Sequence, residues 1–204
     1  MHFSAIVAGL ATLSTTSAFA VPFLGSLPSQ TTTGESFLED LTTYDSAVTD
    51  LVTSLSGLNL QRSAVGNTNQ ISRVLRDTIR LRASSNTARL DAAGIIVVLS
   101  PTDSLAVVNK LTRDIFPHFT AATDLLRKAK TASVLGTTTA FFDAIGVSTP
   151  YGFLELLQFI TNDVVNITTS LTKYIDPASL TNFATVTNNL FSLLNATVAA
   201  YSLP

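Results

Sequence analysis

The sequence predicts an all-α protein, an up-and-down bundle of about five or six amphipathic helices. One stripe of apolar residues keeps a heptad spacing and faces a partner helix over about six turns. Its members are Phe37, Leu41, Tyr44, Val48, Leu51, Leu55 and Leu58. A capping residue followed by proline, a helix-start signal, recurs at Ser100-Pro101, Thr149-Pro150 and Asp176-Pro177. No segment alternates with the period of two that a strand requires.

The N-terminal segment 1–20 has the pattern of a secretory signal peptide. An apolar run at residues 5–13, too short to span a bilayer, precedes an Ala18-Phe19-Ala20 cleavage site. Cleavage there makes Val21 the first mature residue. Residues 21–34 combine proline, glycine and a run of threonines, which predicts a flexible leader. Residues 35–204 are then a single helical-bundle domain.

The first two helices follow from capping signals and periodicity. Thr32 and Glu35 resemble a capping box, and Gly57 stands where a left-handed C-cap ends the first helix. A second helix is expected over residues 69–83. Its core face carries Ile71, Val74, Leu75, Ile79 and Leu81. Ser84-Ser85-Asn86 predicts a break, after which residues 87–99 form a more apolar helical piece.

The later helices begin at the three proline signals. In the helix after Ser100, Pro117 is expected to kink or split the helix, and Gly136 ends it. The helix after Thr149 repeats the heptad stripe through Tyr174, and the helix after Asp176 continues to Tyr201. Because the connections are short, neighbouring helices are expected to run antiparallel.

Composition limits the classes of function. The chain is 46% hydrophobic and 13% charged, has a net charge of −2 and contains no cysteine. A cysteine-free secreted domain depends on its packed core, and this charge balance gives no indication of a nucleic-acid partner. No later apolar run reaches the twenty or so residues of a transmembrane segment. Asn166 and Asn195 each begin an N-glycosylation sequon.

The residues offer no recognisable catalytic set. His118 is the single histidine of the mature chain, and neither an H-E-x-x-H pair nor a G-x-S-x-G elbow is present. Glu155 lies among hydrophobic residues, either exposed or facing a buried ligand. We therefore predict no catalytic residue, no metal and no cofactor, and a protein that is not an enzyme.

Two clusters are candidates for binding. Arg73, Arg76 and Arg80 share one helix face and could hold a lipid carboxylate, an anionic glycan or an acidic patch. Alternatively they form a solvated face, with Asp77 paired to Arg73. The aromatic cluster is either core or the wall of an apolar cavity between helices. It contains Phe141, Phe142, Tyr151, Phe153 and Phe159.

Residues 137–146 surround two of these phenylalanines with threonine and glycine, which suits a mobile lid. Taken together, the two clusters and the heptad stripe predict a set of ligand-binding residues. The set is Phe141, Phe142, Phe153, Leu157, Arg76 and Arg80.

Over residues 36–201 the chain resembles the fungal hydrophobic surface binding protein A family, which includes cell-wall galactomannoproteins. The resemblance rests on the signal peptide, on Leu41-x-x-Tyr44-x-x-x-Val48-x-x-Leu51 and on Leu99-Ser-Pro-Thr-Asp-Ser-Leu105. It continues through Ile115-Phe-Pro-His-Phe119, Leu125-Leu-Arg-Lys-Ala-Lys130 and a Ser/Thr-rich pair of C-terminal helices. The resemblance implies a secreted or cell-wall-associated helical protein that binds hydrophobic surfaces or holds fatty acids, with secreted hydrolases such as cutinases as partners. It implies no catalytic residues.

The prediction is therefore a secreted, extracellular or cell-wall-associated non-enzymatic binder of hydrophobic matter. The partner is a fatty acid or other lipid in an inter-helix cavity, or a hydrophobic polymer surface. One alternative is a structural, glycosylated cell-wall mannoprotein, whose hydroxyl side chains carry O-glycans. Another is a hydrolase with a site around His118.

Overall fold

The structure is a computed structural model that describes residues 32–147 and 150–202. The predicted signal peptide and the leader up to residue 31 lie outside the described residues. The elements are α2 (Gly34–Ser56), η1 (Val65–Asn67), α3 (Thr68–Gly94), α4 (Pro101–Lys110), η2 (Leu111–Ile115), α5 (Phe116–Thr131), α6 (Thr139–Ala144), α7 (Phe153–Leu171) and α8 (Pro177–Ser202). The prediction of an all-α bundle is confirmed: across the described residues there are helices and no strand.

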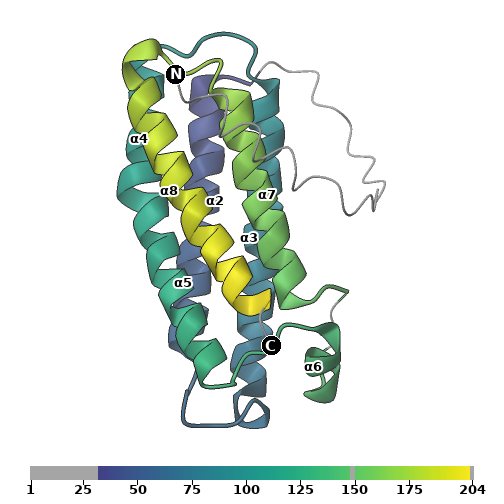
Figure 1. Ribbon diagram of the computed structural model, residues 1–204. Helices are drawn as coiled ribbons and strands as arrows, with labels where there is room; N and C mark the ends of the chain where they lie inside the picture. Colours follow the sequence, from purple (N-terminus) through teal and green to yellow (C-terminus); the bar gives the residue numbers. More distant parts are fainter. Residues whose placement is uncertain (1–31, 148–149, 203–204) are drawn as a thin grey trace.

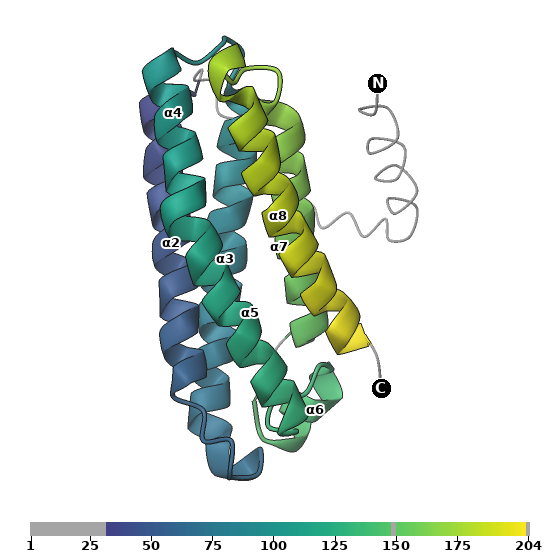
Figure 2. The same ribbon diagram turned by 60° about the vertical axis from the view of Figure 1, so that its left-hand side comes forward.

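The long helices form a ring around one apolar interior (Figures 1 and 2). Helix α3 packs between α2 and α7, α8 packs between α7 and the α4–α5 helix, and α5 returns to α2. The chain passes up and down along the bundle, so α2 and α3 are antiparallel, as are α7 and α8 (Figure 1). However, α3 lies beside α7 and not beside α4. Helices α3 and α7 run in the same direction. The expectation of antiparallel neighbours therefore holds only for the two hairpins.

The core contains the residues that the heptad spacing indicates. All seven stripe residues from Phe37 to Leu58 are buried, and so are the inward positions of α7 and α8. In the described part of the chain, no helix combines the length and the apolar character that crossing a membrane requires. A continuous hydrophobic core holds the bundle together, and each long helix contributes one face to it.

The predictions for the first two helices agree with the structure only in part. Gly57 is the C-cap residue that ends α2, as predicted, but its backbone is right-handed, with φ at −77°. Ser84-Ser85-Asn86 does not break the helix, because α3 continues to Gly94. The hydroxyls of Ser84 and Ser85 bond to carbonyls three residues earlier, which is compatible with a helical backbone. Ile79 is 41% exposed and does not belong to the core face.

The helix starts agree in part with the sequence signals. Helices α4 and α8 begin at Pro101 and Pro177, as predicted. Helix α2 is capped by Thr33 and Ser36, one residue later than expected. Helix α7 begins at Phe153 and not after Thr149, because Glu155 accepts a hydrogen bond from the Gly152 N–H at 3.1 Å and fixes the first turn there.

Pro117 is accommodated by a wide helical turn and does not split the helix. The π-helical segment η2 lies directly before it, and the Phe116 N–H donates to the Leu111 carbonyl five residues earlier. Proline lacks an N–H and its ring crowds the preceding turn, so a wider turn relieves the conflict. Helices α4 and α5 therefore continue as one rod along the bundle (Figure 2).

Candidate functional site

Tyr44 brings a polar group into the apolar interior of the ring. Its side chain is 1% exposed, and its ring packs against Phe119 of α5 with centroids 5.6 Å apart. The hydroxyl is buried and has no hydrogen-bond partner among the described residues. Burial raises the pKa of Tyr44 well above 10, and the charge of Asp163 on α7 adds to that effect. An unpartnered buried phenol is a group that a ligand oxygen can satisfy.

Asp163 forms a second polar position, between α7 and α3. Its carboxylate lies 2.7 Å from the Ser85 hydroxyl and 3.2 Å from the Arg89 guanidinium. Burial raises the pKa of Asp163, and the Ser85 hydrogen bond and the charges of Arg89 and Arg82 lower it by less. Asp163 therefore holds its proton to a higher pH than an exposed aspartate does.

The predicted phenylalanines lie on α6 and at the start of α7, and Figure 1 places these two segments at the same end of the bundle. Phe141 and Phe142 meet edge to face, with centroids 5.3 Å apart. Phe153 packs against Tyr201 of α8 at 5.7 Å, and the Tyr201 hydroxyl donates to the Leu126 carbonyl at 2.7 Å. Phe142 and Phe153 are fully buried. Phe153 and Tyr201 therefore connect α7 and α8 to α5.

Two glycines hold the α6 segment close to its neighbours. A Cβ on Gly136 would lie 2.2 Å from the Phe141 ring, and one on Gly152 would lie 2.7 Å from the Thr137 carbonyl. The Leu154 N–H also bonds to that carbonyl, at 3.4 Å. Residues 136–147 are thus held against the start of α7, and they include the part of the chain that the sequence suggests as a lid.

The remaining predicted ligand residues divide into two places. Leu157 is buried on α7, on the same interior face as Phe153. Arg76 and Arg80 lie on the outer surface, 65% exposed, and pair with Asp77 at 3.6 and 4.0 Å. Arg80 also reaches Asp50 of α2 at 3.8 Å.

Asp77 does not pair with Arg73 as expected, because its carboxylate turns toward α2 and accepts a hydrogen bond from Ser54. Arg76 and Arg80 therefore lie on a solvated face, where they pair with acidic residues, and they do not reach the aromatic cluster.

Arg82 is the arginine that does reach the aromatic residues. Its guanidinium carbon lies 4.1 Å from the centroid of Phe159 and 5.2 Å from that of Tyr151. Those two rings meet edge to face at 5.7 Å. This stack fixes the start of α7 against α3 by cation–π attraction.

His118 belongs to an ion-pair group on the outside of the bundle. Its Nδ1 lies 2.7 Å from Asp45 Oδ1, and the Lys110 ammonium donates to Asp45 at 2.8 Å and to Asp114 at 2.9 Å. The two carboxylates outweigh the effect of burial and raise the pKa of Lys110. The group spans the wide turn η2 and ties it to α2. Glu155 is exposed and serves as the cap described above.

Asp40 has a raised pKa of about 7, caused first by burial and then by the hydrogen bond and charge of Asp91 and the charge of Glu39. Between pH 3.8, the ordinary value, and 7, the folded protein retains a proton that the unfolded chain has released. The stability from this group is therefore fully present below about pH 4 and is lost as the pH rises through 7.

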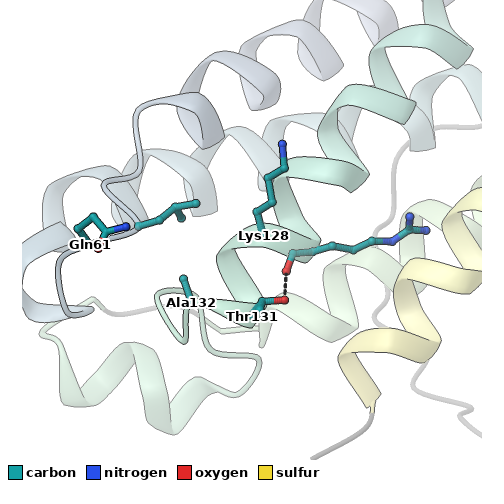
Figure 3. Close-up of a pocket in the computed structure, with 6 residues that line it drawn as sticks. Gln61, Lys128, Thr131 and Ala132 are labelled. Atoms are coloured by element: carbon teal, nitrogen blue, oxygen red, sulfur yellow. Dashed lines mark hydrogen bonds between the residues drawn. The ribbon is translucent and has the colours of Figure 1, made fainter.

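The surface carries a shallow hollow of about 410 Å³, separate from the interior (Figure 3). It is open to solvent and lies between the α2–α3 connection and the last turns of α5. Its lining residues are Leu60, Gln61, Arg127, Lys128, Thr131 and Ala132. In the described part of the chain, no group of three or more His, Cys, Asp or Glu side chains is placed to hold a metal ion.

Sequence reasoning missed the polar groups that face inward. Tyr44 was assigned only as a member of the heptad stripe, although a phenol among aliphatic positions already indicates a buried hydroxyl. Asp163 was not assigned, although an acid beside Val164 and three residues after Ile160 falls at the edge of an apolar face. The sequence gives no signal for Arg82, since spacing alone does not show which of the neighbouring arginines meets a ring.

Comparison with known proteins supports the fold. The chain is similar to the crystal structure of AFMP4P in complex with palmitic acid, with a TM-score of 0.64 and 18% sequence identity. The match covers 82% of this chain and 99% of that chain. No protein-family model and no curated protein sequence matches the chain. At this identity the likeness establishes a shared helical fold.

Proposed function

We propose that this protein binds a fatty acid, or a similar single-chain lipid, between the helices of its bundle, and acts by binding rather than by catalysis. Two arguments support the proposal. The fold is that of a protein solved with palmitic acid, and nearly the whole of that protein is matched. The interior is mainly apolar, and each methylene of an acyl chain buried there contributes about 0.8 kcal/mol.

The observation that carries the proposal is the buried, unpartnered hydroxyl of Tyr44. An unsatisfied buried polar group costs about 1–3 kcal/mol, and an oxygen of a lipid head group would remove that cost by accepting its hydrogen bond. Tyr44 projects from α2 toward α5 and is close enough to α7 for Asp163 to influence its pKa. The head group would then lie inside the ring, and the acyl chain would extend along it.

The aromatic end is the expected opening for the acyl chain. Phe141 and Phe142 stand on the short α6, whose segment covers this end, and Phe153 and Leu157 continue the apolar face inward along α7. Because Phe142 is fully buried in the core, a ligand that enters here must displace the α6 segment. Arg76 and Arg80 have no part in this proposal, since their ion-pair partners hold them on the outer surface.

Secretion and glycosylation belong to the same proposal. Asn166 and Asn195 are exposed on α7 and α8, where a glycan can be attached without disturbing the core. The predicted signal peptide directs the protein out of the cell. Recruitment of a secreted hydrolase is a prediction of the family resemblance alone.

The test is a chain-length series of saturated fatty acids, titrated below their micelle concentrations into protein stripped of lipid by solvent extraction. Native mass spectrometry should show a single bound chain. The affinity should rise by about fourfold for each added methylene, until the chain outgrows the interior. Absence of binding, or an affinity independent of chain length, contradicts the proposal. Absence of binding would favour the structural mannoprotein.

A further inference from the structure

The loop between α3 and α4 presents three aliphatic side chains to solvent. Ile96, Val97 and Val98 are 61%, 64% and 61% exposed, whereas Ile95 and Leu99 on either side are buried. Single exposed apolar residues are ordinary, but an uninterrupted exposed run of large aliphatic residues marks an interaction site. The sequence shows the same run as five apolar residues, far too few for a membrane span.

The bundle holds both ends of this loop. The Leu99 N–H donates to the Tyr174 carbonyl in the α7–α8 turn at 2.7 Å, and the Gly94 carbonyl accepts from the Thr32 N–H at 3.4 Å. The buried side chains of Ile95 and Leu99 anchor the same two points. The three exposed residues therefore form a fixed tip that arches over the end of the bundle opposite α6 (Figures 1 and 2).

The charges around the tip are mainly acidic. Glu35 and Asp103 lie in the first turns of α2 and α4, and Asp91 lies near the end of α3. The α7–α8 turn adds Asp176 beside the basic Lys173. An acidic surround is repelled by anionic head groups, whereas a zwitterionic or uncharged surface leaves the aliphatic tip free to act.

We propose that the tip Ile96–Val97–Val98 docks the protein onto neutral acyl-chain surfaces, such as zwitterionic phospholipid. A stable protein interface buries about 800 Å² and about 20 residues on each side, which three residues on a convex loop do not supply. A fluid acyl layer needs no matching shape. The loop backbone has polar groups that cannot be left without partners in hydrocarbon, so insertion stops at the depth of the side chains.

This docking extends the proposed lipid binding to a second place on the molecule, and the two can fail separately. Vesicle docking depends on the tip, whereas binding of a fatty acid in solution depends on the interior and on Tyr44. A protein that docks onto vesicles but binds no fatty acid would retain this inference and lose the proposed function.

The experiment measures partition of the full mature protein onto phosphatidylcholine vesicles by sedimentation. Val97→Asp should lower the partition coefficient by at least tenfold, because a carboxylate on the tip must leave water. Val65→Asp is the matched control: Val65 is 72% exposed on η1, at the opposite end of the bundle. It should stay within twofold of the wild type. Neither change should alter thermal unfolding or the affinity for palmitate in solution.

Four results overturn the proposal. They are a wild type that does not bind phosphatidylcholine, an unchanged Val97→Asp variant, an equal loss in Val65→Asp, and binding that requires anionic lipid. If Val97→Asp is less stable than the wild type, Val97→Ser provides the same comparison without a charge. It should still weaken partition by several-fold, and an unchanged partition would overturn the proposal.

Discussion

Replacing Tyr44 with phenylalanine should stabilise the lipid-free protein and weaken lipid binding at the same time. The change removes a buried hydroxyl that has no partner among the described residues and keeps the ring that packs on Phe119. Leaving such a group unsatisfied costs about 1–3 kcal/mol. Removing it should therefore raise the free energy of unfolding by about 1 kcal/mol, once the small void that it leaves is allowed for. For a domain of this size, that corresponds to a rise in Tm of about 2–4 °C.

The effect on binding has the opposite sign. If the hydroxyl donates to the lipid head group, its loss removes a hydrogen bond of about 0.5–1.5 kcal/mol, or more where the acceptor is charged. The affinity for palmitate should therefore fall by about tenfold. Thermal unfolding followed by circular dichroism measures the first quantity, and calorimetric titration with palmitate measures the second.

Tyr201→Phe is the matched control. Tyr201 is as deeply buried as Tyr44, but its hydroxyl donates to the Leu126 carbonyl at 2.7 Å. Its removal should lower Tm by about 2–4 °C and leave the palmitate affinity within twofold. A lipid-free Tyr44→Phe variant with an unchanged or lower Tm would refute the unpartnered hydroxyl. An unchanged palmitate affinity would refute its contact with the lipid.

Three further changes test other parts of the structure. Asp40→Asn should raise the free energy of unfolding by about 1–2 kcal/mol at pH 8, a value reduced for the partial exposure of Asp40. The same change should have little effect at pH 4, and urea unfolding at both pH values measures the difference. Phe153→Ala should cost about 3–5 kcal/mol by the same method, since the ring is fully buried against Tyr201, and a loss below 1 kcal/mol would contradict its core position. Gly152→Ala should destabilise by about 1–3 kcal/mol, because its Cβ meets the Thr137 carbonyl. Gly66→Ala, which meets only the flexible Arg62 side chain, should cost less in a parallel thermal scan.

The helices could be predicted where local signals agree with packing. The heptad stripe from Phe37 gives the buried face of α2, and a capping residue before proline gives the starts of α4 and α8, because both depend on residues within one or two turns. Ser85 shows where such reasoning fails. Serine followed by asparagine favours a break, yet the Ser85 hydroxyl bonds to Asp163, a partner 78 residues away, and the helix continues.

The candidate site was predicted less well, for the same reason. The aromatic cluster was found because its residues are close in sequence. Arg82 was not distinguished from Arg76 and Arg80, because only the packing of α3 on α7 determines which arginine meets Phe159. In the sequence, Tyr44 is one more residue of a regular apolar stripe. Its hydroxyl becomes a buried group only because α5 and α7 enclose it.

The order of helices around the ring has a consequence for how the chain folds. Each hairpin, α2 with α3 and α7 with α8, can form from contacts local in sequence, but the ring closes only through distant pairs. Tyr201 reaches Leu126 across 75 residues, and the Asp176 N–H reaches Ser104 across 72. Such separations raise the contact order, so we expect slower folding than for a bundle whose helices pack in chain order. During synthesis the sides of α4, α5 and α7 that α8 covers stay open to water until α8 has left the ribosome, so the ring closes only when α8 packs.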